Sequence, residues 1–370
     1  MSERGSIVTA VSLGADIGSL EMIIAVRRPS GCIEFLEHPL NCNCGPSCIL
    51  AELRDRVLPS VGCGSWRLSE TFLKSHGIMV EKHREPVCIW TAIEYLLEKC
   101  TGDCAYTFSY VEAPERRLYP ISSPHREIED IQSLTSSVSY DMLTHMFPIL
   151  LVNVKTGTSF YRMDSPTDFV RVGGSSIGVS TIMALGKTLL QESSIRKMID
   201  IGKTSGTASK VDLLVEDIYG GDCDSIGLAG SIIASCLGKA TGDSVSSPAD
   251  VAKSLLDMIC MNTAQLTNLH AKVHKCRTAL IVGSLADEPV LAECTQRVLH
   301  ILAGKSDDGL KAVFLKQSKY LGCLGALLRR ESLVQGLGSK VWDVPINTAT
   351  VEDGVHDETY TKLRISTPPR

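Results

Sequence analysis

Short apolar runs that end in a glycine-containing turn recur along this chain. They occupy residues 7–18, which end in Asp-Ile-Gly, and residues 147–154 and 278–282, which are nearly continuous in Ile, Leu and Val. Runs of this length and composition are typical of buried strands. Longer segments with helical periodicity lie between them, for example 87–100 and 252–274. This alternation predicts an α/β protein in which helices flank mixed sheets.

The layout of these segments repeats. A strand, a glycine turn and a second strand are expected at 7–28 and again at 147–163. We therefore expect an internal duplication, with two α/β lobes whose turns converge on a cleft between them. Helical periodicity also predicts helices over 129–143 and 226–239. The predicted units are an N-terminal lobe at 1–145, a C-terminal lobe at 146–330 and a tail at 331–370.

The stretch from Phe169 to Leu190, FVRVGGSSIGVSTIMALGKTLL, combines several local signals. It predicts a strand, a tight turn at the two glycines and a helix from about Ile177 that one of the two serines caps. The first turn of a helix offers unpaired N–H groups and a positive dipole end, and Arg171 adds a fixed charge. The pattern indicates an anion site. A structural turn beside a surface arginine is the alternative that the local sequence leaves open.

The composition excludes several function classes. The 370 residues are 44% hydrophobic and 21% charged, which is typical of a packed globular protein. With a net charge of −5 there is no basic field for nucleic acid. No apolar run reaches the roughly 18–20 residues of a membrane span, and the first residues lack the apolar core of a signal peptide. We expect a cytoplasmic protein with neither a nucleic-acid partner nor a membrane span.

The fourteen cysteines are scattered, mostly in apolar segments, which is typical of reduced, buried thiols. Three of them are closer together: Cys42, Cys44 and Cys48 in NCNCGPSC, with His38 nearby. A zinc site is one interpretation of this group, but the usual CxxC spacing is absent. The spacing favours a small Gly/Pro loop that holds thiols.

Motifs spread over residues 12–328 resemble those of the eukaryotic-type (type II) pantothenate kinases. The most specific match lies at 211–238, where DIYGGD is followed by Gly-Leu-x-Gly and an Ala-Ser pair. The segments RVGGSSIG, LIVGSL and YLGCLGALL resemble further family segments in the same order. The resemblance implies an actin/hexokinase/heat-shock-ATPase-like fold, ribonuclease H-like, with duplicated mixed-sheet domains and a cleft between them. The DIYGGD block disfavours a sugar or acetate kinase of the same superfamily.

The resemblance implies an activity and its partners. Members of this family phosphorylate pantothenate to 4'-phosphopantothenate with ATP and Mg²⁺, the first step of coenzyme A biosynthesis. They are dimers and are commonly inhibited by acyl-CoA. The expected partners are therefore pantothenate, ATP, acyl-CoA as an inhibitor, and a second subunit in a homodimer or in a heterodimer with a paralogue.

The resemblance also implies site residues by position. Asp130, or the adjacent Glu129, is expected to act as the catalytic base, and Arg171 to hold the pantothenate carboxylate or the transferring phosphoryl group. Substrate contacts are implied for Arg171, Thr156, Ser175 and, toward the partner subunit's pocket, Ile233 and Ala234. Nucleotide contacts are implied for Asp16, Gly18, Ser19, Gly157, Gly283, Ser284, Gly322 and Gly325, with Asp16 also near magnesium.

The chain departs from the family in its phosphate loops. Leu20 and Ile23 stand where the family has Thr and Lys, and neither can bond a phosphate. Lys155 opens a turn that usually reads Gly-Ser-Gly, and Val179 replaces a glycine. Asp130 is one methylene shorter than the family's Glu, and a displacement of about 1 Å can cost roughly a hundredfold in rate.

Two functions remain open from the sequence. The first is a pantothenate kinase. The second is a catalytically impaired, pseudokinase-like subunit that pairs with an active paralogue and regulates or completes it. Phosphoryl transfer depends on positioning and electrostatics, so altered phosphate loops affect the chemistry directly.

Overall fold

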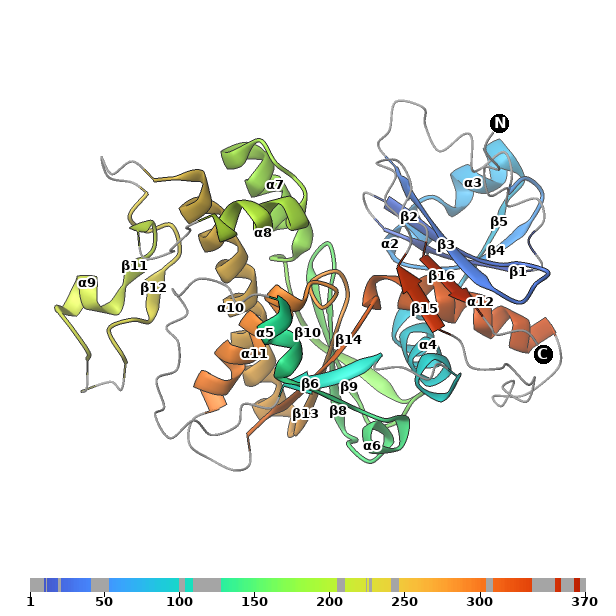
Figure 1. The fold of residues 1–370 in the computed structure, drawn as a ribbon. Coiled ribbons are helices and arrows are strands. Elements are labelled where there is room, and N and C mark those ends of the chain that lie inside the picture. Colours follow the sequence, from blue (N-terminus) through green and yellow to red (C-terminus); the bar gives the residue numbers. More distant parts are fainter. Residues whose placement is uncertain are drawn as a thin grey trace.

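The computed structural model describes most of the chain and places its strands in two large sheets (Figure 1). The described residues are 10, 12–18, 21–40, 53–99, 104–108, 128–204, 210–223, 225, 228–240, 246–303, 309–334, 350–353 and 363–366. Within these ranges no helix is both long and apolar enough to cross a membrane.

The first sheet has the strand order β15-β16-β3-β2-β1-β4-β5. Strands β1, β2 and β3 form an antiparallel meander, while β4 is parallel to β1 and β5 is parallel to β4. The bounds are β1 Ser12–Ile17, β2 Glu21–Arg27, β3 Ile33–Pro39, β4 Val57–Val61, β5 Met79–Lys82, β15 Thr350–Asp353 and β16 Leu363–Ser366. Helices α2 (Cys63–Arg67) and α3 (Ser69–His76) connect β4 to β5.

The second sheet repeats the pattern of the first. Its order is β10-β9-β8-β13-β14-β6-β7, in which β8, β9 and β10 form an antiparallel meander and β13 and β14 follow in parallel to β8. The bounds are β6 Ala105–Phe108, β7 Thr135–Ser137, β8 Ile149–Val154, β9 Thr158–Met163, β10 Phe169–Ser175, β13 Thr278–Val282 and β14 Lys311–Leu315. The shared 3-2-1-4-5 order confirms the predicted duplication and the ribonuclease H-like fold class.

Helices α4 (Glu85–Lys99) and α12 (Leu321–Val334) lie between the two sheets (Figure 1). They share one hydrophobic core with Ile23 and Phe35 of the first sheet and with Ile149 and Leu151 of the second. Because side chains alternate along a strand, Leu150 and the other intervening residues of β8 point to the opposite face of the sheet.

That opposite face of the second sheet is covered by four helices, which form a separate core. They are α7 Val179–Leu190, α8 Ile195–Lys203, α10 Pro248–His274 and α11 Pro289–Ala303. Helix α10 begins at Pro248 with Ser247 as its N-cap, because the serine hydroxyl accepts from the Asp250 N–H at 3.2 Å. The outer face of the first sheet has its own smaller core, which includes Phe72 of α3.

Two predicted helices are wrong. Residues 129–143 form α5 (Ile128–Ser133), the short strand β7 and α6 (Tyr140–Thr144). The apparent periodicity is misleading because Ile131 and Val138 belong to different cores. The described part of 226–239 forms turns and β12 (Ile233–Ser235), which pairs with β11 (Leu213–Leu214).

The chain passes between the two lobes more often than boundaries at 145 and 330 suggest. Strands β6 and β7 precede residue 145 but belong to the second sheet, where β6 pairs with β14 and β7 pairs with β6. Helix α12 follows the second sheet along the chain but packs on α4 and β1. Strand β16 of the predicted tail pairs with β3, and β15 pairs with β16.

Candidate active site

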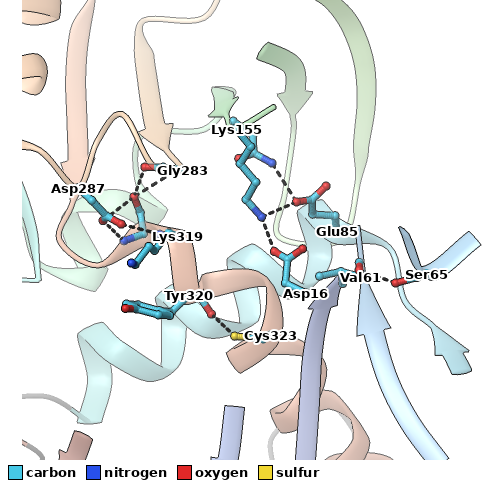
Figure 2. A network of polar contacts seen from close by, with 12 residues as sticks. Asp16, Val61, Ser65, Glu85, Lys155, Gly283, Asp287, Lys319, Tyr320 and Cys323 are labelled. Carbon is cyan, nitrogen blue, oxygen red and sulfur yellow. Dashed lines mark hydrogen bonds and ion pairs between the residues drawn. The ribbon is translucent and has the colours of Figure 1, made fainter. Parts of the chain in front are cut away.

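The end of β1 and the turn after β8 meet at an ion-pair cluster (Figure 2). Asp16 lies near the end of β1, and Lys155 follows β8, its counterpart in the second sheet. The Lys155 ammonium donates to Asp16 Oδ2 and, at 2.9 Å, to Oε1 of Glu85, the first residue of α4. Asn153 Nδ2 donates to the same Glu85 oxygen at 3.1 Å. One side chain thus joins elements from both halves of the duplicated fold.

Backbone encloses the Asp16 carboxylate on two sides. The residue is 5% exposed. A Cβ added to Gly62, at the end of β4, would lie 2.7 Å from Oδ1, and a Cβ on Gly322, at the start of α12, would collide with Oδ2. These two glycines therefore allow the chain to pass directly against the carboxylate. Gly322, expected at the nucleotide, has a direct packing role here.

Burial and neighbouring charges shift the pKa values of this cluster in opposite directions. Burial alone would lower the pKa of Lys155, but the Asp16 and Glu85 carboxylates raise it, so the side chain is an ammonium. Burial would raise the pKa of Glu85, and the charge and hydrogen bond of Lys155 bring it below its usual value. For the more enclosed Asp16, burial dominates and raises the pKa, while Lys155 opposes the shift.

The turn after β8 packs against the start of α7. A Cβ on Gly178 would lie 2.5 Å from Gly157 Cα and 2.5 Å from the Thr156 carbonyl oxygen, and a Cβ on Gly157 would lie 2.8 Å from the Ser175 carbonyl oxygen. Thr156, Gly157 and Ser175, expected at the substrate and nucleotide, therefore lie together. The exposed Thr156 is at the surface of this turn.

The predicted tight turn and serine cap at the start of α7 are wrong. Strand β10 continues through Gly173 and Gly174 to Ser175, and neither glycine has a positive φ. Gly173 instead makes room for the His270 ring, and Gly174 for the guanidinium of Arg171.

The N-cap of α7 is Gly178, whose N–H donates to Thr181 Oγ1 at 3.3 Å. The Val179 N–H donates to the Lys155 carbonyl at 2.7 Å. Two donors that an anion would need at this helix end are therefore already used.

Arg171 lies on β10 opposite Tyr161 of β9. Burial, followed by the Glu85 charge, raises the pKa of the Tyr161 hydroxyl, and the charges of Arg171 and Lys155 oppose this shift. Tyr161 therefore lies between the exposed Arg171 and the ion-pair cluster. Sequence reasoning missed Tyr161 and Glu85. The only signal for Glu85 was an acidic residue before Pro86, which is also typical of an ordinary helix start.

The end of β13 forms a second polar network beside the first (Figure 2). Gly283 has a φ of 96° and passes so close to Val154 that a Cβ there would collide with the Val154 carbonyl. The Ser318 hydroxyl accepts from the Gly283 N–H at 3.0 Å and donates to its carbonyl at 2.9 Å. Asp287 accepts from the backbone N–H groups of Ser318 and Lys319, and burial raises its pKa to about 7. Gly283 and Ser284, expected near adenosine, thus lie beside the strand that leads to Lys155.

The other expected site residues lie apart from this cluster or outside the description. Gly325 is buried where α12 meets the Cys88 carbonyl of α4. Ile233 is buried and Ala234 exposed on β12, beyond α10 from the first sheet (Figure 1). Asp130 belongs to α5, which packs on α11. The side chains of Glu129 and Asp130 lie outside the described part, as do Ser19 and the three clustered cysteines Cys42, Cys44 and Cys48.

The aspartates of DIYGGD shape their own loop. Asp217 Oδ2 accepts from the Leu214 N–H at 2.8 Å and pairs with Lys239 Nζ at 2.5 Å. Asp222 Oδ1 accepts from the Gly230 N–H at 2.6 Å. Helix α9 (Val215–Tyr219) ends at Gly220, whose φ is 81°, as its glycine predicts. The motif therefore holds a small β11–α9–β12 unit in shape.

The residues around Asp16 do not fit the magnesium ion that the resemblance implies. Oδ2 is bonded to the Lys155 ammonium, and Oδ1 faces the backbone at Gly62. Among the residues that the structure describes, no three His, Cys, Asp or Glu side chains are grouped to hold a metal.

Comparison with known proteins identifies the family of this chain. The family model described as Fumble matches residues 23–329. A pantothenate kinase of Schizosaccharomyces pombe is 26% identical over 319 residues, covering 83% of this chain and 71% of that protein. Pantothenate kinase 1 of Arabidopsis thaliana is 27% identical over 307 residues, covering 81% and 73%.

A third relative has a different name. A Mus musculus protein named 4'-phosphopantetheine phosphatase is 29% identical over 282 residues, which cover 76% of this chain but only 31% of that protein. The chain thus spans about a third of this relative's length. Among solved structures, a ROK family glucokinase from Streptomyces griseus in complex with glucose and AMPPNP has a TM-score of 0.40 at 12% identity, covering 86% of this chain and 99% of that one. The fold class follows from the strand order described above and not from this likeness.

Proposed function

Because the chain belongs to the Fumble family, the eukaryotic-type pantothenate kinases, we propose that it transfers a phosphoryl group from ATP to pantothenate. One observation carries the proposal: the end of β1 and the turn after β8 meet at the Asp16–Lys155 pair, and Ser175 of β10 packs against that turn, which also contains Thr156. A cation thus lies at the junction of the duplicated lobes, and phosphoryl transfer depends on positioned charge of this kind.

Each residue has a proposed role. Arg171 binds the pantothenate carboxylate, since its planar guanidinium suits a two-oxygen anion. Thr156 and Ser175 bond polar groups of the substrate. Asp130, with Glu129 beside it, serves as the base that takes the proton of the pantothenate hydroxyl. Gly283 and Ser284 contact the adenosine, and Ile233 and Ala234 contribute from one subunit of a dimer to the other. The product, 4'-phosphopantothenate, enters coenzyme A biosynthesis in the cytoplasm.

The test is turnover of radiolabelled pantothenate by the purified chain with ATP, with product separated from substrate by ion exchange. We expect labelled 4'-phosphopantothenate from the wild type. Arg171→Ala is expected to raise the KM for pantothenate by at least about tenfold, because a charged hydrogen bond contributes roughly 1.5–3 kcal/mol. Lys74→Ala, which removes an exposed cation of α3 that is paired with Glu70, is the control. An unchanged KM in the Arg171 variant would contradict the assigned role.

A second candidate function is a catalytically impaired subunit that regulates or completes an active paralogue. The observation that favours it is the altered first phosphate loop, where Leu20 and Ile23 replace residues that could bond a phosphate. On this alternative the lone chain yields no product, whereas it binds a complete paralogue and changes that enzyme's rate or its response to acyl-CoA. The same assay, repeated with the paralogue added, separates the two functions.

A further inference from the structure

The phosphate end of the site already contains a cation that belongs to the protein. Lys155 Nζ lies between Asp16 Oδ2 and Glu85 Oε1 and is bonded to both (Figure 2). These contacts use two of the three N–H donors of the ammonium. The third donor points away from both carboxylates, since the donors are arranged tetrahedrally, and it suits a phosphate oxygen.

The position of this ammonium is fixed by its backbone. The Lys155 N–H donates to the Gly157 carbonyl at 2.9 Å, and its own carbonyl accepts from the Val179 N–H at 2.7 Å. The turn itself packs against Gly178 at the start of α7. The lysine side chain therefore extends toward Asp16 from a turn that is fixed by packing and hydrogen bonds. It occupies a position where the pantothenate kinase family has a glycine.

Magnesium needs the space that Lys155 fills. The ion takes six oxygen ligands at about 2.0–2.1 Å and usually keeps several waters. Asp16 is 5% exposed and its oxygens are closed off by the backbone at Gly62 and Gly322 and by the ammonium. An ion at Asp16 could enter only by displacing Lys155 from both carboxylates.

We propose that Lys155 is a built-in cation that takes the place of magnesium at the phosphates, so that this chain binds ATP without a divalent ion. The choice of ATP as the nucleotide rests on the proposed function. The claim that Lys155 excludes a divalent ion from Asp16 rests on the contacts alone.

The first experiment measures ATP affinity by calorimetry in excess Mg²⁺ and in EDTA. The wild type is expected to bind with dissociation constants that agree within about threefold in the two buffers. Lys155→Met keeps the length of the side chain without its charge, and we expect it to bind at least about tenfold more weakly in EDTA and to recover with Mg²⁺. Lys155→Arg keeps the charge and remains independent of the metal. Lys187→Met, an exposed lysine of α7, is the matched control.

The second experiment measures Mn²⁺ binding by electron paramagnetic resonance without nucleotide. Loss of the ammonium leaves the carboxylates of Asp16 and Glu85 facing one position, and hard divalent cations prefer such oxygen ligands. We expect Lys155→Met to gain one Mn²⁺ site that the wild type lacks. Adding Asp16→Asn to that variant is expected to remove the site. Far-UV circular dichroism confirms that each variant is folded.

The outcomes separate this inference from the proposed function. ATP binding by the wild type that disappears in EDTA and returns with Mg²⁺ overturns the inference. A wild-type Mn²⁺ site that Asp16→Asn removes also overturns it, as does the absence of any Mn²⁺ site in both proteins. If ATP does not bind in either buffer, the nucleotide of the proposed function is wrong, and the Mn²⁺ comparison alone decides whether Lys155 excludes the metal.

Discussion

At the scale of single residues, the carboxylates of the site are positioned by contacts with the backbone as well as by other side chains. Asp16 lies against Gly62 and Gly322, and Asp287 accepts from the N–H groups of Ser318 and Lys319. Enclosure of this kind removes water from a carboxylate and disfavours its charged form. The two aspartates differ in their bonding partners. Asp16 is bonded to a lysine ammonium, whereas Asp287 accepts from backbone N–H groups and from the Ser318 hydroxyl.

Asp287 makes folding stability depend on pH. Burial raises its pKa from 3.8 to about 7, so the folded protein holds a proton that the unfolded chain releases above about pH 4. Its contribution to stability is complete below pH 3.8 and is lost as pH rises through 7. Between pH 5 and pH 8 the wild type should lose about 2–3 kcal/mol of unfolding free energy relative to Asp287→Asn. Urea unfolding at several pH values measures this difference.

The matched control is Asp200→Asn, an exposed position on α8. Its unfolding free energy should keep a constant offset from the wild type over the same pH range. If the unfolding free energy of Asp287→Asn also keeps a constant offset from the wild type, Asp287 is ionised throughout that pH range. Burial then does not raise its pKa into that range.

At the scale of elements, the α4–α12 pair positions Glu85 against Lys155. Gly325 of α12 lies directly against the Cys88 carbonyl of α4, one turn from Glu85. Such close contact brings the helix axes together and aligns the start of α4 with the ends of β1 and β8. A side chain at position 325 forces the two helices apart. This displaces Glu85 in the site as well as residues of the core.

Gly325→Ala should destabilise the protein by about 1–3 kcal/mol, because the added methyl meets backbone that cannot rotate away. The comparison is Gly202→Ala in α8, where the new Cβ lies at an ordinary 3.6 Å from Lys253 N. That variant should be neutral or more stable by up to about 1 kcal/mol, because alanine favours a helix. Chemical denaturation measures both. Equal stabilities for the two variants would contradict the close-packing argument.

At the scale of the whole molecule, the duplicated sheets are joined rather than independent. One hydrophobic core contains α4, α12 and residues of both sheets, and the segment with β6 and β7 crosses to the second sheet before residue 145. Shared packing of this kind couples the unfolding of both parts.

We therefore expect a single thermal transition for the full chain. Far-UV circular dichroism, which follows both sheets, should give the same midpoint as tryptophan fluorescence, to which Trp90 of the shared core contributes. The calorimetric and van't Hoff enthalpies should agree. Two resolved transitions would mean that the lobes unfold separately.

The sequence by itself determined the fold class and most of the elements. Continuous apolar runs specified β8 and β13, and helical periodicity specified α4 and α10, because these patterns follow from local geometry and burial. The family followed from ordered motifs such as DIYGGD. The failures at 129–143 and 226–239 arose where short segments pair with strands elsewhere in the chain, such as β6 and β11.

Only the tertiary structure decided which charges meet. Asp16, Glu85 and Lys155 are far apart in sequence, and their contact depends on how β1, α4 and β8 end at one place. Gly173 and Gly325 likewise owe their role to a neighbour from another segment, not to their own torsion angles. Local sequence encodes propensity and periodicity, whereas an ion pair between segments exists only when packing has set the distance between them.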